Sequence, residues 1–380
     1  MASSPRIEFA LVASVNGMRF DRERPEGIEF NRAQEENLRI KLLPRDPAED
    51  ATGHQSGLEC KAYSSLPATE EQIAFVSAYN GGRVMLRIAD GIELPYCLNE
   101  EELITKDGAF KKTFHPRRYL CPADIVELIE TAESRLSQHV GRFLKLIRWR
   151  QGVDAPGEIV NSCTLYWRVG GSVYPIAPLP GGGPSNAIEI STLLGVHWDD
   201  EDIANIRDLW LDQCKVEPLG HELIREAGQL MAKSPRSAIL IMVAALETAV
   251  KTHVSRVAPD TAWLMQELPS PPIFKILKDY VPAMHMDRGK DLDFWEILKP
   301  SIKRVQQLIE VRNKVAHTGN IPENAGSLRD ALLLISDLLY VLDVLEGNEW
   351  AKTQVSYPIR KALGWPGPKH GRMKFSMQTV

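Results

Sequence analysis

Residues 234–254 read SPRSAILIMVAALETAVKTHV, and this stretch decides the fold of the C-terminal part of the chain. Ser234 followed by Pro235 predicts the start of a helix, because serine caps helix N-termini and proline fits the first helical position. The residues that follow are apolar on nearly all sides of a helix. A helix of this kind has to lie at the centre of a bundle or in a dimer interface.

A second apolar helix is predicted for residues 327–347, SLRDALLLISDLLYVLDVLEG. Ser327 and Asp330 resemble a capping box at its start, and Gly347 closes it. Further helices are predicted at residues 218–233, between Pro272 and Pro282, and at about residues 292–317 with a kink or break at Pro300. The C-terminal part of the chain is therefore predicted to be an all-α bundle.

The N-terminal part of the chain has mostly the alternating pattern of β-strands. One amphipathic helix is predicted from Pro122 to Arg150, where apolar residues recur every three or four positions. Strands are predicted at residues 7–15, 71–79, 83–89, 91–98, 163–169 and 172–179. The glycine-rich residues 180–184 lack the Gly-Lys-Ser/Thr of a phosphate-binding loop and are predicted to be a flexible connection. Between residues 7 and about 120, a β-meander is the local structure that the strands favour.

The change from a strand pattern to a helix pattern predicts two domains, with a boundary near residues 205–216. The predicted fold class is α+β. A β-rich N-terminal domain with one long helix, residues 1–210, is followed by an all-α domain, residues 216–350. Residues 351–380 form a basic tail with interleaved aromatic side chains, a composition compatible with RNA stacking and also with a tail that docks on its own domain.

The composition is that of an ordinary globular protein, and it excludes several classes. The net charge of -5 argues against a protein that coats nucleic acid generally, although it is compatible with a local basic site. The longest apolar run, residues 238–246, is about half of the roughly 18 residues that cross a bilayer. The N-terminus also lacks the pattern of a secretory signal. We therefore expect a cytoplasmic protein with no membrane partner.

The cysteines and the acidic residues predict no metal and no cofactor. The 5 cysteines are far apart and include no C-x-x-C pair, which argues against a disulfide framework and a zinc site. The cluster at residues 197–202, HWDDED, offers metal ligands, but acidic residues that open a helix also satisfy its N-terminal dipole without any ion. We expect the second role.

Candidate catalytic residues lie at the end of the helix predicted for residues 292–317, in RNKVAH, residues 312–317. His317 can accept or donate a proton near neutral pH, and Arg312 stays cationic and can grip two phosphate oxygens. These residue types suit metal-independent RNA cleavage, in which the ribose 2′-hydroxyl attacks its own phosphodiester. On an ideal helix the two side chains are about 140° apart around the axis and about 7.5 Å apart along it, so they do not share one face.

The motif resembles the R-x4-6-H motif of HEPN ribonucleases, and residues 217–254, EPLGHELIREAGQLMAKSPRSAILIMVAALETAVKTHV, resemble the paired opening helices of the Apea-like HEPN group. The resemblance covers roughly residues 216–347. It implies a metal-independent RNA endonuclease without a cofactor, in which a homodimer pools both motifs in one cleft. The implied product is a 2′,3′-cyclic phosphate with a 5′-hydroxyl.

The resemblance also implies a biological setting. Similar proteins serve as toxin-like effectors of antiphage defence, in which the N-terminal domain restrains or triggers the nuclease. The trigger implied here is unknown and can be a phage component, a protein or a nucleotide. The alternative is a non-catalytic HEPN bundle, used for dimerisation or ligand binding, with recognition by the N-terminal domain.

Each residue of the predicted site also has a structural interpretation. Arg312 and His317 suit a salt-bridging arginine and a histidine at a helix C-terminus. Asn313 can orient a phosphate or His317, or it can be an ordinary surface or dimer contact. Glu247 can hold Arg312 or merely satisfy a neighbouring cation. The remaining basic residues, read as RNA contacts or as solvated charges, are Lys314, Lys303 and Arg304.

Overall fold

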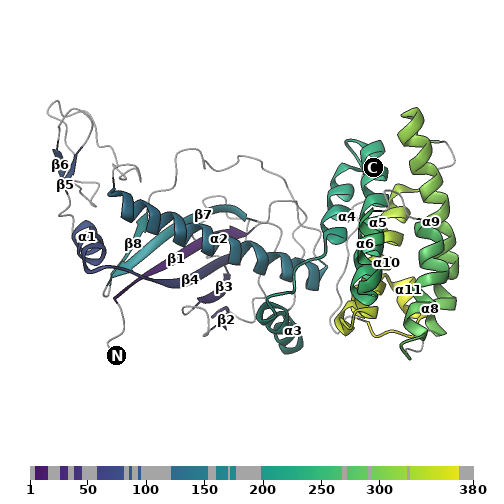
Figure 1. Ribbon diagram of the computed structural model, residues 1–380, viewed down its shortest axis with the longest axis horizontal. Helices are drawn as coiled ribbons and strands as arrows, with labels where there is room; N and C mark the ends of the chain where they lie inside the picture. Colours follow the sequence, from purple (N-terminus) through teal and green to yellow (C-terminus); the bar gives the residue numbers. More distant parts are fainter. Residues whose placement is uncertain are drawn as a thin grey trace. The chain divides into compact units, whose positions relative to one another are not determined.

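The computed structural model describes residues 5–15, 26–32, 38–44, 58–80, 85–87, 93–95, 121–152, 160–169, 172–176, 198–267, 272–289, 293–322 and 326–367 (Figure 1). The chain forms two compact units. Unit 1 comprises Met1–Leu144 and Glu158–Asp200, and unit 2 comprises Lys145–Gly157 and Glu201–Val380. The fold class is α+β, as predicted, because unit 1 holds an antiparallel sheet and the described elements of unit 2 are helical.

Unit 1 is built on a six-stranded antiparallel sheet with the order β2-β3-β4-β1-β7-β8. Its strands are β1 Arg6–Val15, β2 Ile28–Arg32, β3 Leu38–Pro44, β4 Leu58–Pro67, β7 Val160–Val169 and β8 Ser172–Ile176. A separate hairpin pairs β5 Met85–Arg87 with β6 Glu93–Pro95. Because β1 pairs with β4 and not with β2, the strands between Arg6 and Pro67 are not ordered as the simple meander that was predicted there.

The long helix α2, Ala123–Gln151, covers one face of this sheet within unit 1 (Figure 1). Along β1 every second residue is buried, which is the period of a strand with one face on the core. The ring of Phe30 on β2 meets the ring of Phe143 on α2 edge to face, with centroids 4.9 Å apart. The prediction of one long amphipathic helix over residues 122–150 is confirmed.

The prediction of a strand at residues 71–79 is wrong, because Glu70–Asn80 form helix α1. A capping box starts this helix. The backbone N–H of Gln72 donates to Thr69 Oγ1 at 3.1 Å, and the backbone N–H of Thr69 donates to Gln72 Oε1 at 3.0 Å. Two N–H groups at the helix start thus have hydrogen-bond partners. This stabilises a helix in a stretch whose apolar pattern suggested a strand. The glycine-rich residues 180–184 lie outside the described residues.

Unit 2 is a bundle of helices around α5 and α10. Its elements are α3 Asp200–Leu211, α4 Leu219–Leu230, α5 Pro235–Val257, a 3-10 turn Pro259–Thr261, α6 Ala262–Glu267, α7 Ile273–Lys275, a π-turn Ile276–Tyr280, α8 Val281–Met286, α9 Asp293–Thr318, α10 Leu328–Leu345, a 3-10 turn Glu349–Thr353 and α11 Tyr357–Ala362. As predicted, the two apolar helices are central: α5 packs against α4, α9 and α10. Among the described helices, only α5 is long and apolar enough to cross a membrane, and half of its apolar window is buried inside the bundle.

The predicted end signals of α10 are present. Ser327 Oγ accepts a hydrogen bond from the backbone N–H of Asp330 at 3.3 Å. At the other end Gly347 has φ +94°, and the N–H of Asn348 donates to the carbonyl of Asp343 at 3.0 Å. This is the Schellman arrangement that glycine permits.

The helix predicted to end at Pro282 continues through it to Met286. Proline inside a helix lacks an N–H donor and clashes with the carbonyl four residues earlier. The π-turn Ile276–Tyr280 widens the helix just before Pro282, which relieves that clash. The break that was one alternative at Pro300 is absent, because α9 runs without interruption from Asp293 to Thr318 with Pro300 inside it.

Unit 2 includes a segment that the predicted boundary near 205–216 leaves out. Lys145–Gly157, with the last two turns of α2, belong to unit 2. The basic and aromatic end of this helix is buried there, including Arg148, Trp149 and Arg150. The start of the predicted tail is also docked, since Ala351 and Val355 are buried, while residues 368–380 lie outside the described ones.

Two glycines of α4 are expected to respond to alanine in opposite directions. A Cβ at Gly220 would lie 3.0 Å from Ala249 Cβ and 3.1 Å from the Ala245 carbonyl, so Gly220→Ala should destabilise the protein by about 1–3 kcal/mol. At Gly228 the nearest atom is Leu332 Cδ2 at 3.6 Å, and Gly228→Ala should stabilise by about 0.5–1 kcal/mol through helix propensity. Urea unfolding measures both. Equal effects of the two changes would contradict the close packing of α4 on α5.

Candidate functional site

The predicted motif occupies the last two turns of α9. The helix is intact to Thr318 and stops at Gly319, which has φ +70° and donates its N–H to the Val315 carbonyl at 2.8 Å. The hydroxyl of Thr318 donates to the Lys314 carbonyl at 2.8 Å. Because the helix does not fray before Gly319, the wide angle between Arg312 and His317 persists, and one chain does not bring them onto one face.

Glu247 on α5 contacts Arg312. Arg312 Nη2 lies 3.5 Å from Glu247 Oε2, and Lys251 Nζ lies 3.4 Å from the other carboxylate oxygen. The Arg312 guanidinium also donates to Asn313 Oδ1 at 3.1 Å. The side chain of Glu247 is only 16% exposed, so its charge is partly shielded from water. One carboxylate thus contacts two cations, so both alternatives that the sequence left open for Glu247, a contact with Arg312 and a contact with a neighbouring cation, are present.

The other predicted site residues are exposed on α9. They are His317, Asn313, Lys314, Lys303 and Arg304. On a regular helix His317 and Lys314 lie within about 60° of one another, and Lys303 falls between them in angle. Arg312 lies on the opposite side, next to α5. His317 therefore shares a face with two lysines, and the structure joins Arg312 to Glu247 instead.

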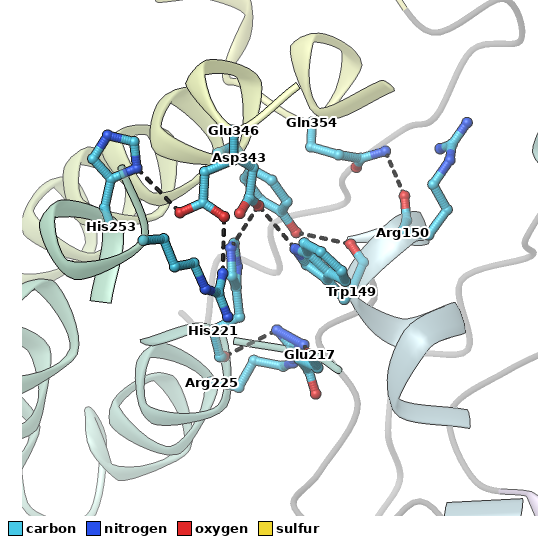
Figure 2. A network of polar contacts seen from close by, with 11 residues as sticks. Trp149, Arg150, Glu217, His221, Arg225, His253, Asp343, Glu346 and Gln354 are labelled. Carbon is cyan, nitrogen blue, oxygen red and sulfur yellow. Dashed lines mark hydrogen bonds and ion pairs between the residues drawn. The ribbon is translucent and has the colours of Figure 1, made fainter. Parts of the chain in front are cut away.

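A buried polar network, which the sequence did not predict, lies in unit 2 at the end of α2 (Figure 2). The indole N–H of Trp149 donates to Asp343 Oδ2 at 2.8 Å, and His221 Nε2 lies 2.9 Å from the same oxygen. The Tyr340 hydroxyl donates to the carbonyl of Trp149 at 3.4 Å. Beside them, Glu217, two residues before the start of α4, forms ion pairs with Arg148 and Arg225.

A second branch of the network is centred on Glu346 (Figure 2). Its carboxylate lies 3.1 Å from His253 Nδ1 and accepts from Arg256 Nη1 at 2.8 Å. The other ring nitrogen of His253 lies 2.9 Å from Nε2 of His285 on α8. Burial raises the pKa of Glu346, but the hydrogen bond from His253 and the charge of Arg256 outweigh it, so the pKa lies below its ordinary value.

The His221–Asp343 pair has the residue types of an acid–base dyad, but it is buried and we assign it a structural role. The two side chains are 3% and 6% exposed, so a substrate cannot reach them. A shallow depression between α3 and the turn after α10 is lined by Asp208, Asp212, Asn348 and Trp350, among others, and by no residue of the predicted motif. The network therefore holds helices together, and the exposed end of α9 is the better candidate for chemistry.

The predicted absence of a metal site remains a prediction. Among the described residues, no group of three or more histidine, cysteine or acidic side chains is placed to hold a metal ion. His197 lies outside the described residues. In the acidic cluster at the start of α3, Asp202 is buried and pairs with Arg150 Nη2 at 2.7 Å.

Comparisons with protein-family models, with curated proteins and with solved structures find no match to this chain. The resemblance of residues 216–347 to HEPN proteins therefore stays a prediction from the sequence.

Glu346→Gln is expected to lower the free energy of unfolding at neutral pH. Because the folded-state pKa of Glu346 lies below the unfolded value of about 4.3, the carboxylate stabilises the protein above that pH and loses this effect as pH falls through the folded pKa. Urea unfolding between pH 7 and pH 3 should show the difference from wild type shrink below about pH 4. The control is Glu349→Gln, at an exposed residue that pairs only with Lys352 among the contacts described. A difference that stays constant down to pH 3 would contradict the assignment.

Proposed function

We propose that this protein is a metal-independent RNA endonuclease of HEPN type, with His317 and Arg312 as its catalytic residues and RNA as its substrate. The observation that carries the proposal is the geometry at the end of α9. Arg312 is oriented by Glu247 at 3.5 Å, and His317 is exposed one turn and a half further along a basic helix. The end of the helix, residues 311–320, contains no acidic side chain that would repel a phosphate.

The proposed reaction needs one proton acceptor, one proton donor and a cation. The 2′-oxygen forms a bond to phosphorus as its proton leaves, and the bond from phosphorus to the 5′-oxygen breaks as that oxygen takes up a proton. His317 acts as general base or general acid in one of these transfers, and water takes up or supplies the other proton. Arg312 stabilises the charge that develops on the phosphoryl oxygens. Asn313, which already accepts a hydrogen bond from Arg312, helps to hold the guanidinium.

A homodimer completes the proposed site. In a single chain the two catalytic side chains point about 140° apart. A two-fold axis beside the end of α9 lets His317 of one chain face the same phosphate as Arg312 of a second chain, which is the arrangement that the HEPN resemblance implies. Lys314, Lys303 and Arg304 then supply further cations for the RNA strand.

Control by unit 1 is proposed to act through α2. This helix is continuous from unit 1, which it leaves after Leu144, into unit 2, where Trp149 bonds to Asp343 on α10. A shift of α2 would disturb a buried hydrogen-bond network, and such networks tolerate little displacement. We propose that a phage component, a protein or a nucleotide acts on unit 1 in this way and that the nuclease is a toxin-like defence effector.

The alternative function is a non-catalytic HEPN module for dimerisation or ligand binding, with recognition by unit 1. One observation favours it. The contacts of Arg312 with Glu247 and Asn313 are also those that a purely structural arginine would make.

Cleavage of total RNA in EDTA separates the two functions. The wild-type protein is expected to cleave RNA, while His317→Ala and Arg312→Ala should lose at least about 100-fold in rate, since a general acid–base group contributes that much or more. Arg288→Ala, at an exposed arginine after α8, should retain activity. Gel analysis of labelled RNA measures the rates. Equal cleavage by all four proteins, or none by wild type with a lysate of infected cells added, would refute the nuclease.

A further inference from the structure

Arg236 lies beside the proposed catalytic end of α9. It is the second residue of α5, directly after Pro235, and its Nη1 donates to the carbonyl of Gly319 at 3.0 Å. Eleven residues further along α5, Glu247 contacts Arg312. The two contacts occur in opposite order along the two helices, so α5 and α9 are antiparallel. Residues of α5 therefore contact the motif helix on both sides of His317.

The position of Arg236 is unfavourable for its own helix. A cation in the first turn is repelled by the positive end of the helix dipole, and α5 has no acidic residue in that turn. The same guanidinium lies at the negative, C-terminal end of α9, where a cation is stabilised. The charge of Arg236 therefore stabilises the C-terminal end of α9 and can attract an anion that binds there.

Arg236 also differs from Arg312 in charge compensation. Arg312 is paired with Glu247, whereas within the described part of the chain Arg236 forms no ion pair with an acidic side chain, and it is exposed. A guanidinium has five N–H donors, and the contact with Gly319 uses one of them. The remaining donors and the uncompensated charge match a phosphate group.

We infer that Arg236 is a phosphate-binding residue of this site, and that it grips the backbone of a single-stranded RNA next to the phosphate at His317. The inference rests on the proposed function for the identity of the ligand. It adds the first turn of α5 to a site that the motif alone places on α9. Lys233 lies just before α5, is exposed, and adds to the positive charge near Arg236.

The test measures binding of a fluorescein-labelled single-stranded RNA of 20 nucleotides by anisotropy, in the His317→Ala protein so that no cleavage occurs. Arg236→Gln should weaken binding about 5- to 10-fold at 50 mM salt and reduce the slope of log Kd against log salt by about 0.7, the value for one phosphate contact. Arg236→Lys keeps the charge and should retain most of the slope. Arg288→Gln should change neither quantity, because Arg288 is exposed and follows His285, which contacts His253 near the opposite end of α5.

A purely structural role for Arg236 gives a different result. The unfolding midpoint and the amide exchange of α9 would then change in Arg236→Gln, while the salt slope would not. An unchanged slope overturns the inference, as does an absence of RNA binding by the His317→Ala protein. Cleavage by wild type together with an unchanged slope leaves the nuclease standing and removes only Arg236. A reduced slope without cleavage by wild type leaves Arg236 as an RNA contact and removes the nuclease.

Discussion

One oxygen of the Asp343 carboxylate is shared by Trp149 and His221 in the interior of unit 2. Burying a carboxylate is unfavourable unless hydrogen bonds replace its water, and removal of one partner from a buried charged group costs about 3–5 kcal/mol. These three residues come from α10, α2 and α4. The bundle therefore needs the last two turns of α2, although the sequence between α2 and the other helices of unit 2 belongs largely to unit 1.

The same turn of α10 links this interaction to the proposed site. Glu346, three residues after Asp343, binds His253 and Arg256 near the end of α5. Nearer the start of α5, Glu247 contacts Arg312 on α9. Contacts thus run from α2 through α10 and α5 to the end of α9. We propose that this run of contacts, part of which is buried, transmits a change in unit 1 to the exposed end of α9.

Strong local signals predicted the long helices of the fold, whereas strands β2, β3 and β4 were not predicted. The caps of α10, the start of α5 at Pro235 and the periodicity of α2 were all visible in the sequence. Helix α1 was missed because its apolar run concealed the capping box at Thr69. The network was missed for a different reason: Trp149 and Asp343 are 194 residues apart, and a single histidine or aspartate in an apolar helix gives no sign of its partner. The proposed site could be predicted where its residues are close in sequence, as in RNKVAH. Glu247 was considered as a partner of Arg312 because their charges are opposite. The function was predicted from the resemblance alone.

We propose that the 2′-hydroxyl of RNA is the nucleophile and that the residues at the end of α9 promote its attack without a metal. The chemistry of the cleaved ends tests this claim most directly. Mass spectrometry of a defined RNA cleaved by the purified protein should find a 2′,3′-cyclic phosphate on one fragment and a 5′-hydroxyl on the other. A 3′-hydroxyl with a 5′-phosphate would mean that water is the nucleophile and would contradict the account.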